Sequence, residues 1–269
     1  MSTDSGSTDF FTHRETSPLA ASTHFSRCAS TPPPAEDGLT FATALALFSH
    51  TLEQQEHGRP DIHRAMQHLA DEALIGRTSQ CLHAVWTIGQ RVWLTADLHL
   101  GHRNVIGYCD RPFHDVRSMD QALVRQLGKV GAAEWLVIVG DVAMGDHTLS
   151  FPLLRQVPGR KVLVLGNHDI TRAGVCHYVS ATADDGSPLF EAVVPFLFWT
   201  GHGGQQVVVS HYPLQLPERS EPLATGQEAR RPSPLLNYHG HLHRNLLSHS
   251  AGIQYVNVGW DVTQGLVCL

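Results

Sequence analysis

Five short clusters of Asp, Asn and His side chains each follow a run of apolar residues directly. The clusters are Asp97-Leu98-His99, Gly140-Asp141, Gly166-Asn167-His168-Asp169, Ser210-His211-Tyr212-Pro213 and Gly240-His241-Leu242-His243. If the apolar runs are strands, every cluster lies at a carboxyl end, where open α/β sheets place their ligand sites. Carboxylate, amide and imidazole groups together bind borderline divalent metals. The pattern therefore predicts a metal site assembled from several strand ends.

The prediction depends on the ordered set rather than on any one cluster. Asp-x-His or Gly-Asp alone is common, and Gly-Asn-His-Asp alone could be a turn, because Gly, Asn and Asp are turn formers. Glycine precedes three of the clusters and lets the backbone turn sharply, so that side chains can converge.

The elements that must position these clusters are expected from about residue 84 onward, where short apolar runs alternate with amphipathic stretches. Strands are predicted at 84–88 and 92–95 (a hairpin-like pair), 135–139, 162–165, 196–199 and 207–209 (a second hairpin), 235–238 and 255–258. Helices are predicted after Ser118 as cap and near 149–156. Strands that alternate with helices imply parallel pairing and an α/β fold.

The first part of the chain has a different composition and a different pattern of apolar residues. Residues 1–38 are rich in Ser, Thr and Pro, which predicts a disordered tail. Two helices are expected over 41–52 and 62–73, with Gly76 as a stop, so we divide the chain into a tail (1–38), a helical N-terminal extension (39–83) and a main domain (84–269). The polar, Pro-rich stretch 214–234 is expected to form a functional rim.

Composition narrows the class of protein. The chain of 269 residues carries a formal charge of −6 with only 19 Lys plus Arg, which makes extended DNA or RNA a poor candidate substrate. Five scattered cysteines without a Cys-x-x-Cys pair argue against a disulfide framework. We find no secretory signal pattern and no apolar run of the ~20 residues that a membrane span needs. The expected location is the cytoplasm.

The five clusters resemble the ordered signature of the calcineurin-like metallophosphoesterases: D-x-H, G-D, G-N-H-D/E, a later His and G-H-x-H. The resemblance covers roughly residues 90–262, and Asp97 to Phe113 and Asn257 to Asp261 are similar to the small bacterial and phage branch. It implies a four-layer αββα sandwich of two mixed sheets flanked by helices. The chain reads Val-Ala-Met-Gly-Asp after Gly140-Asp141, without the Asp-Arg-Gly that protein Ser/Thr phosphatases carry, which puts a phosphoprotein substrate in doubt.

Carried over by position, the resemblance implies a dinuclear metal site. One metal would take Asp97, His99 and His243, the other Asn167, His211 and His241, with Asp141 as the bridge. A bridging hydroxide would attack phosphorus in line, and His168, held and polarised by Asp169, would protonate the leaving group. His102 and Arg111 are candidate substrate contacts, because a guanidinium pairs with phosphate in bidentate fashion.

Imidazole-rich shells suit transition metals better than Mg²⁺ or Ca²⁺. We expect two divalent ions, with Mn²⁺ favoured and Fe, Zn, Ni and Co as alternatives. The expected substrate is a small phosphate ester, a phosphodiester before a monoester, with no membrane and no extended nucleic acid as partner. A protein partner of the N-terminal helices has no support. Two alternatives stay open: a DNA or RNA nuclease of the same superfamily, and a non-catalytic scaffold on this fold, like the retromer subunit that resembles these enzymes.

Overall fold

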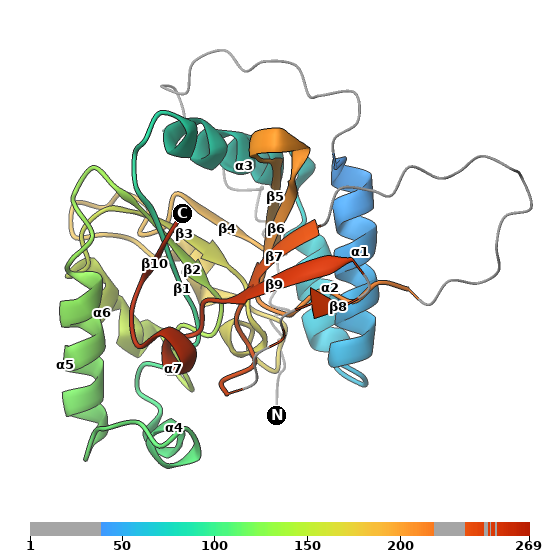
Figure 1. Cartoon of the computed structure of the whole chain (residues 1–269). Helices are drawn as coiled ribbons and strands as arrows, with labels where there is room; N and C mark the ends of the chain where they lie inside the picture. Colours follow the sequence, from blue (N-terminus) through green and yellow to red (C-terminus); the bar gives the residue numbers. More distant parts are fainter. Residues whose placement is uncertain (1–38, 218–234, 245–246, 248, 251) are drawn as a thin grey trace, which may run out of the picture.

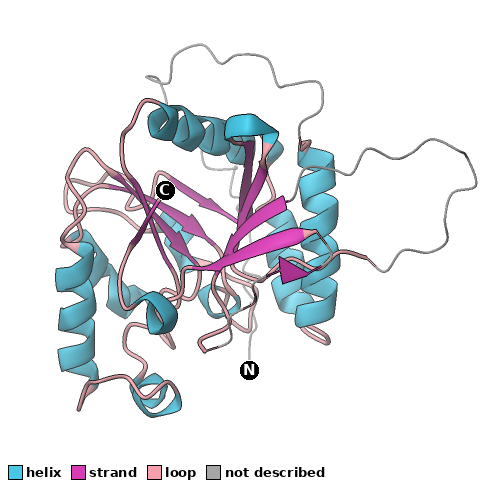
Figure 2. Cartoon of the chain, in the orientation of Figure 1, coloured by secondary structure: helices cyan, strands magenta, loops and turns pink. Residues whose placement is uncertain are grey.

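The computed structural model of the chain describes residues 39–217, 235–244, 247, 249–250 and 252–269 (Figure 1). The predicted tail (1–38) and most of the predicted rim (214–234) lie outside the described residues. Two five-stranded sheets form the centre of the structure, and helices flank them (Figure 2).

The first sheet carries the earlier clusters. Its strands are β1 (Val92–Thr95), β2 (Trp135–Val139), β3 (Arg160–Val164), β4 (Ala192–Val194) and β10 (Val267–Cys268), in the order β10-β1-β2-β3-β4. β1 to β4 are parallel, and β10 is antiparallel to β1. Every residue of β2 is buried, as its continuous apolar sequence predicts for a strand covered on both faces.

The second sheet carries the later clusters. Its strands are β5 (Phe196–Thr200), β6 (Gln206–Ser210), β7 (Leu235–His239), β8 (His249–Ser250) and β9 (Ile253–Asn257), in the order β5-β6-β7-β9-β8. The predicted β5–β6 hairpin is confirmed, with Phe196 opposite Ser210. β6, β7 and β9 are parallel, whereas β5 and β8 are antiparallel to their neighbours. Both sheets are therefore mixed, which confirms the expected fold class.

Helices that follow the strands of the first sheet lie on one side of the molecule (Figure 1). They are α4 (Arg103–Tyr108), α5 (Val116–Leu127) and α6 (Phe151–Arg155), the last preceded by the 3-10 turn η2 (His147–Ser150). The cap of α5 was expected at Ser118 but is Asp115, whose side chain accepts a hydrogen bond from the Ser118 N–H at 2.7 Å. A short helix, α7 (Trp260–Thr263), precedes β10.

The N-terminal region contains three helices where two were expected. They are α1 (Phe41–Gln55), α2 (Pro60–His68) and α3 (Glu72–Thr87). The predicted strand at 84–88 is wrong, and Gly76 lies inside α3 rather than at a helix end. Asp71 caps α3 by accepting from the Leu74 N–H at 2.8 Å, and burial of one face of α3 outweighs the strand preference of its last residues.

The three helices share one hydrophobic core with the sheets. The Phe48 ring of α1 lies 5.2 Å from the Phe196 ring of β5, and the Phe198 N–H of β5 donates to Ser79 of α3 at 3.1 Å. α1 and α3 therefore lie against the second sheet, while the division of the chain at residue 84 stays a prediction. None of the described helices is long and apolar enough to cross a membrane.

Candidate metal centre

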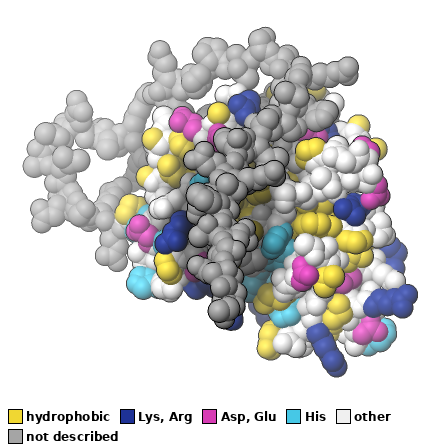
Figure 3. Space-filling view, turned by 180° about the vertical axis from the view of Figure 1, so that it is seen from behind, with side chains coloured by type: hydrophobic (Ala, Val, Ile, Leu, Met, Phe, Trp, Pro, Cys, Tyr) yellow, Lys and Arg dark blue, Asp and Glu magenta, His cyan; other side chains and the backbone are white. Residues whose placement is uncertain are grey.

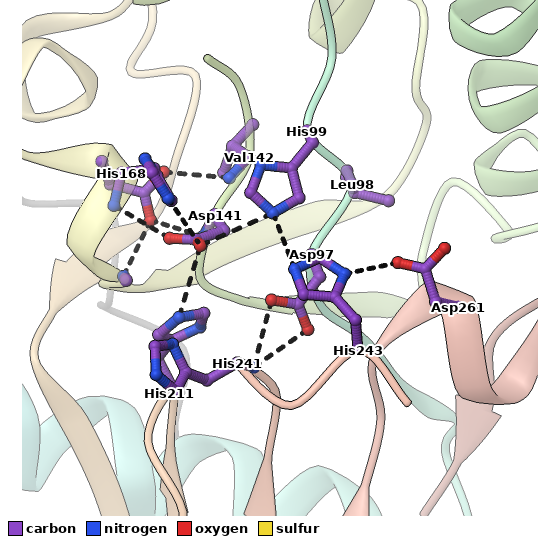
Figure 4. A network of polar contacts seen from close by, with 12 residues as sticks. Asp97, Leu98, His99, Asp141, Val142, His168, His211, His241, His243 and Asp261 are labelled. Atoms are coloured by element: carbon purple, nitrogen blue, oxygen red, sulfur yellow. Dashed lines mark hydrogen bonds and ion pairs between the residues drawn. The ribbon is translucent and has the colours of Figure 1, made fainter. Parts of the chain in front are cut away.

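The ends of strands from both sheets bring the predicted side chains to one place (Figure 4). Asp97 and His99 follow β1, Asp141 follows β2, His211 follows β6, and His241 and His243 follow β7. Asn167, His168 and Asp169 form the 3-10 turn η3 after β3. Residues as far apart in the chain as Asp97 and His243 are thereby neighbours.

Asp97, His99 and His243 form the first group, with one ligand atom from each lying within 4.8 Å of the others. His99 Nε2 is 3.3 Å from His243 Nε2. Burial lowers the pKa of His99 to about 3, so its imidazole is neutral and offers a lone pair. This is the set that the resemblance implies for one metal.

Asp141 lies between this group and His211. Its Oδ2 atom is 3.6 Å from His99 Nε2 and 3.5 Å from His211 Nε2. Asp97, Asp141 and His211 form a second group within 4.8 Å, and the His241 ring lies 5.1 Å from the His211 ring. The central position of Asp141 agrees with the bridging role expected of it.

The pKa of His211 is raised by a neighbouring charge, unlike the pKa values of His99 and His241. Burial alone would lower its pKa, but the Asp141 carboxylate raises the pKa to about 10. Burial likewise lowers the pKa of His241, to about 3, and there no carboxylate reverses the effect. Burial also raises the pKa of Asp97 to about 6.

Two buried atoms indicate that this group of side chains fits a cation. His211 donates its Nδ1–H to the Val139 carbonyl at 2.9 Å, which aims Nε2 into the site. Within the described part of the chain, His211 Nε2 and Asn167 Oδ1 are buried without a hydrogen bond. Asn167 Oδ1 is a buried acceptor without a partner, which costs about 1–3 kcal/mol. A divalent cation would satisfy this oxygen directly, and His211 Nε2 once that nitrogen has lost its proton.

The backbone of the site is held in an unfavourable conformation. Asp97, His99, Asp141 and His241 have φ values of 56°, 51°, 56° and 67°, in the left-handed region. Such residues cost about 1–3 kcal/mol each and cluster at functional sites. Gly240 permits close packing here, because a Cβ atom on it would lie 2.7 Å from Asp97 Oδ2.

His168 lies at the accessible edge of the group. Its side chain is 35% exposed, and its Nε2 is 3.9 Å from Asp141 Oδ2. The main-chain N–H of His168 donates to Asp141 Oδ1 at 2.9 Å. The predicted proton donor is thus next to the predicted bridge and open to a substrate.

Asp169 has contacts other than those expected. It was predicted to hold the His168 imidazole, but no hydrogen bond joins the two side chains among the described residues. Its buried carboxylate instead accepts from the main-chain N–H groups of Gly166, Asp141 and Val142, at 2.8, 2.9 and 3.0 Å. Asp169 therefore ties the turn after β3 to the turn after β2.

Arg111 does not have the contacts expected of a substrate-binding residue. Its side chain is fully buried. It donates to both oxygens of Asp261 and to the carbonyls of Asp97 and Leu98. Since these partners occupy the guanidinium, the geometry does not support contact with substrate.

His102, the other candidate substrate contact, is the N-cap residue of α4, and its ring lies 5.6 Å from the His99 ring. His239, which sequence analysis left out, is buried on β7 with Nδ1 donating to the Gly240 carbonyl. Of these two histidines, His102 is the one whose ring lies beside a predicted metal ligand.

Asp261 is a functional residue to which the sequence analysis gave no role. Its Oδ2 accepts from His243 Nδ1 at 2.6 Å, which leaves His243 Nε2 to face the site. Carboxylates that orient a ligand imidazole in this way are typical of metal sites. The Gly259-Trp260-Asp261 run, quoted for the resemblance alone, could have indicated it.

The two mixed sheets with flanking helices are consistent with the calcineurin-like fold, and candidate metal-binding groups lie at their strand ends. A model of the calcineurin-like phosphoesterase family matches residues 90–245, and the chain belongs to that family.

Its relatives agree with the phage and small bacterial branch. The chain is 30% identical over 190 residues to the Gene 66 protein of Mycobacterium phage D29, which covers 65% of this chain and 90% of that protein. It is 29% identical over 195 residues to the Gene 66 protein of Mycobacterium phage L5, and this match covers 65% of this chain and 88% of that protein. Among solved structures, the protein of unknown function AQ665 from Aquifex aeolicus covers 67% of this chain and 96% of its own, at 20% identity and a TM-score of 0.46.

Proposed function

We propose that the protein hydrolyses a small phosphate ester at a dinuclear metal centre. The observation that carries the proposal is the position of Asp141, whose Oδ2 lies within 3.6 Å of imidazole nitrogens from both predicted metal positions. One position would comprise Asp97, His99 and His243, and the other Asn167, His211 and His241. Family membership supports the same reaction class.

Two divalent ions bound by these residues would lower the pKa of water towards neutrality and offset the charge on a phosphate. The protein's own side chains supply the charge balance, the proton for the leaving group and a contact to the substrate. Asp97 and Asp141 supply two negative charges against four positive ones, so the loaded site keeps a net charge of about +2 that attracts an anionic ester. His168 gives a proton to the departing oxygen, and His102 contacts the substrate from the N-terminus of α4.

Several finer points are proposals by analogy. We favour a phosphodiester over a monoester, because many small members of the family prefer diesters. We favour Mn²⁺ over Fe, Zn, Ni or Co, because the two carboxylates and the Asn167 amide oxygen are ligands that suit Mn²⁺, whereas the imidazoles suit the other metals as well. We also place the protein in the cytoplasm.

A screen of metal-loaded protein tests the proposal. We expect hydrolysis of bis-p-nitrophenyl phosphate to exceed that of p-nitrophenyl phosphate, with cyclic nucleotides and dinucleoside polyphosphates assayed beside them. Asp141→Asn is the matched control, since it removes the bridging charge at nearly constant volume. If none of the compounds is hydrolysed with any of the five metals, the scaffold alternative replaces this proposal.

A nuclease is the second candidate, and the charge distribution disfavours it. On the face that Figure 3 shows, the described Lys and Arg side chains are interspersed with Asp and Glu rather than gathered in a continuous stripe. Binding to a long nucleic acid normally needs such a stripe. Cleavage of an oligonucleotide faster than of the small diesters would reverse this ranking.

A further inference from the structure

A hydrogen bond connects the N-terminal helices to the metal centre. The Tyr212 hydroxyl donates to Glu56 Oε1 at 3.0 Å, across 156 residues of chain. Glu56 is the C-cap residue of α1, and Tyr212 directly follows His211. Tyr212 is fully buried, and Glu56 is 9% exposed. Burial raises the pKa of Tyr212, so the phenol stays a donor.

The Tyr212 ring packs against both imidazoles of the second predicted metal position. Its centroid lies 5.1 Å from the His211 ring and 5.0 Å from the His241 ring. His211 is oriented in addition by its bond to the Val139 carbonyl. The His241 imidazole makes no hydrogen bond to the described residues, so its orientation depends on packing against Tyr212 and His211.

A second contact fixes the same segment to α1. The Gln215 N–H donates to Thr51 Oγ1 at 2.8 Å, and the Thr51 hydroxyl in turn donates to the Leu47 carbonyl. Thr51 is fully buried. The last turns of α1 therefore hold the chain at two points, Tyr212 and Gln215, immediately after a predicted metal ligand.

We propose that α1 positions the second metal site: Glu56, through Tyr212, sets the orientation of His211 and His241 and thereby the affinity of the ion they bind. The inference rests on the proposed function, because it takes these two histidines as ligands. Glu56 and Tyr212 are positioning residues, since neither touches the metal or the substrate. Loss of such outer partners typically lowers metal affinity about 10–100-fold.

The test measures binding of Mn²⁺ in competition with a chromophoric chelator, resolved into a first and a second ion. In Tyr212→Phe and Glu56→Ala, we expect the affinity for the second ion to fall about 10–100-fold. The affinity for the ion at Asp97, His99 and His243 should stay close to wild type. Glu56→Gln keeps a carbonyl acceptor for the Tyr212 hydroxyl and should recover most of the loss. The absorption spectrum of Co²⁺-loaded protein gives a second readout, because its bands follow the geometry of the ligands.

Tyr255→Phe is the matched control. It also removes a hydroxyl from the second sheet, one that donates to the Leu214 carbonyl at 2.7 Å, but the Tyr255 ring contacts neither predicted ligand. Its two affinities should equal those of wild type. The free energy of unfolding of each metal-free variant, from urea titration, separates lost stability from lost affinity.

The outcomes are distinct. If Tyr212→Phe and Glu56→Ala lose stability but bind both ions like wild type, α1 has only a structural role and the inference is overturned. If wild-type protein binds no Mn²⁺ or other transition metal, the proposed function fails and the inference fails with it.

Discussion

Arg111 and Asp261, 150 residues apart, form a buried bidentate ion pair beside the metal centre. Arg111 Nε donates to Asp261 Oδ1 at 2.7 Å, and Nη2 donates to Oδ2 at 2.8 Å. The same guanidinium binds the carbonyl of Asp97, whose backbone is in the left-handed region, and Asp261 orients His243. Arg111 thus fixes two predicted ligands of one metal without facing the substrate.

Replacement of Arg111 should damage stability and metal binding together. Arg111→Met removes the guanidinium that pairs with both oxygens of the buried Asp261 carboxylate and leaves it with the His243 Nδ1–H as a donor, so we expect the free energy of unfolding to fall by about 3–5 kcal/mol. Arg111→Lys cannot reproduce the bidentate pair and should also weaken the first metal position. Arg91→Lys is the control, because its pair with Glu134 is largely exposed and contributes about 0–1 kcal/mol. Urea titration measures the stabilities, and a variant at position 111 as stable as wild type would contradict this prediction.

His168→Ala should reduce kcat by about 10²–10⁴-fold while both metal ions remain bound. The reason is that His168 donates a proton to the leaving oxygen and lies outside both ligand groups. The loss should be smaller for p-nitrophenolate, which leaves readily as an anion, than for phenolate or an alkoxide. His114→Ala, a histidine on the surface, serves as control. Equal losses for all leaving groups would assign His168 a different role.

Metal binding should release a proton from His211. Because Asp141 holds the pKa of His211 near 10 in the metal-free protein, this imidazole is cationic at neutral pH and must lose its proton to become a ligand. Raising the pH towards 10 therefore favours binding, by up to about tenfold per pH unit for one displaced proton. His99 and His241 are already neutral and should add nothing. Calorimetric titrations in buffers with different ionisation enthalpies count the protons, and a count near zero would rule out a charged His211.

Asp169→Asn should destabilise the fold more than a conservative change normally does. The carboxylate accepts from three main-chain N–H groups, whereas an amide would turn its own NH₂ group towards one of them. A buried N–H without an acceptor costs about 1–3 kcal/mol. Asp184→Asn, on the surface, is the control. Thermal unfolding of the metal-free proteins checks this, and unchanged stability would mean that another acceptor replaces the carboxylate.

Local patterns in the sequence predicted most of the fold and the ligand groups. β2 is a continuous apolar run, β3 ends in one after Arg160-Lys161, and the ligand clusters follow these strands closely in the sequence. Local sequence therefore contained the information needed to predict these elements. The end of α3 was missed because its strand-like residues are helical only through the surface that α3 buries. The true roles of Arg111 and Asp169, and the Glu56–Tyr212 bond, depend on partners that only the tertiary structure brings together. Motif spacing cannot reveal such partners.

Because α1 and α3 lie against the second sheet, the order in which the chain is synthesised affects how it folds. Both helices are complete by residue 87, but β5, against which they pack, ends only at residue 200. During translation, the apolar faces of the helices therefore have no sheet to pack against until more than a hundred further residues have been synthesised. Contacts this distant in sequence fold slowly and leave intermediates prone to aggregation. Recombinant production should accordingly gain more from slow translation at low temperature, or from added chaperones, than from stronger expression.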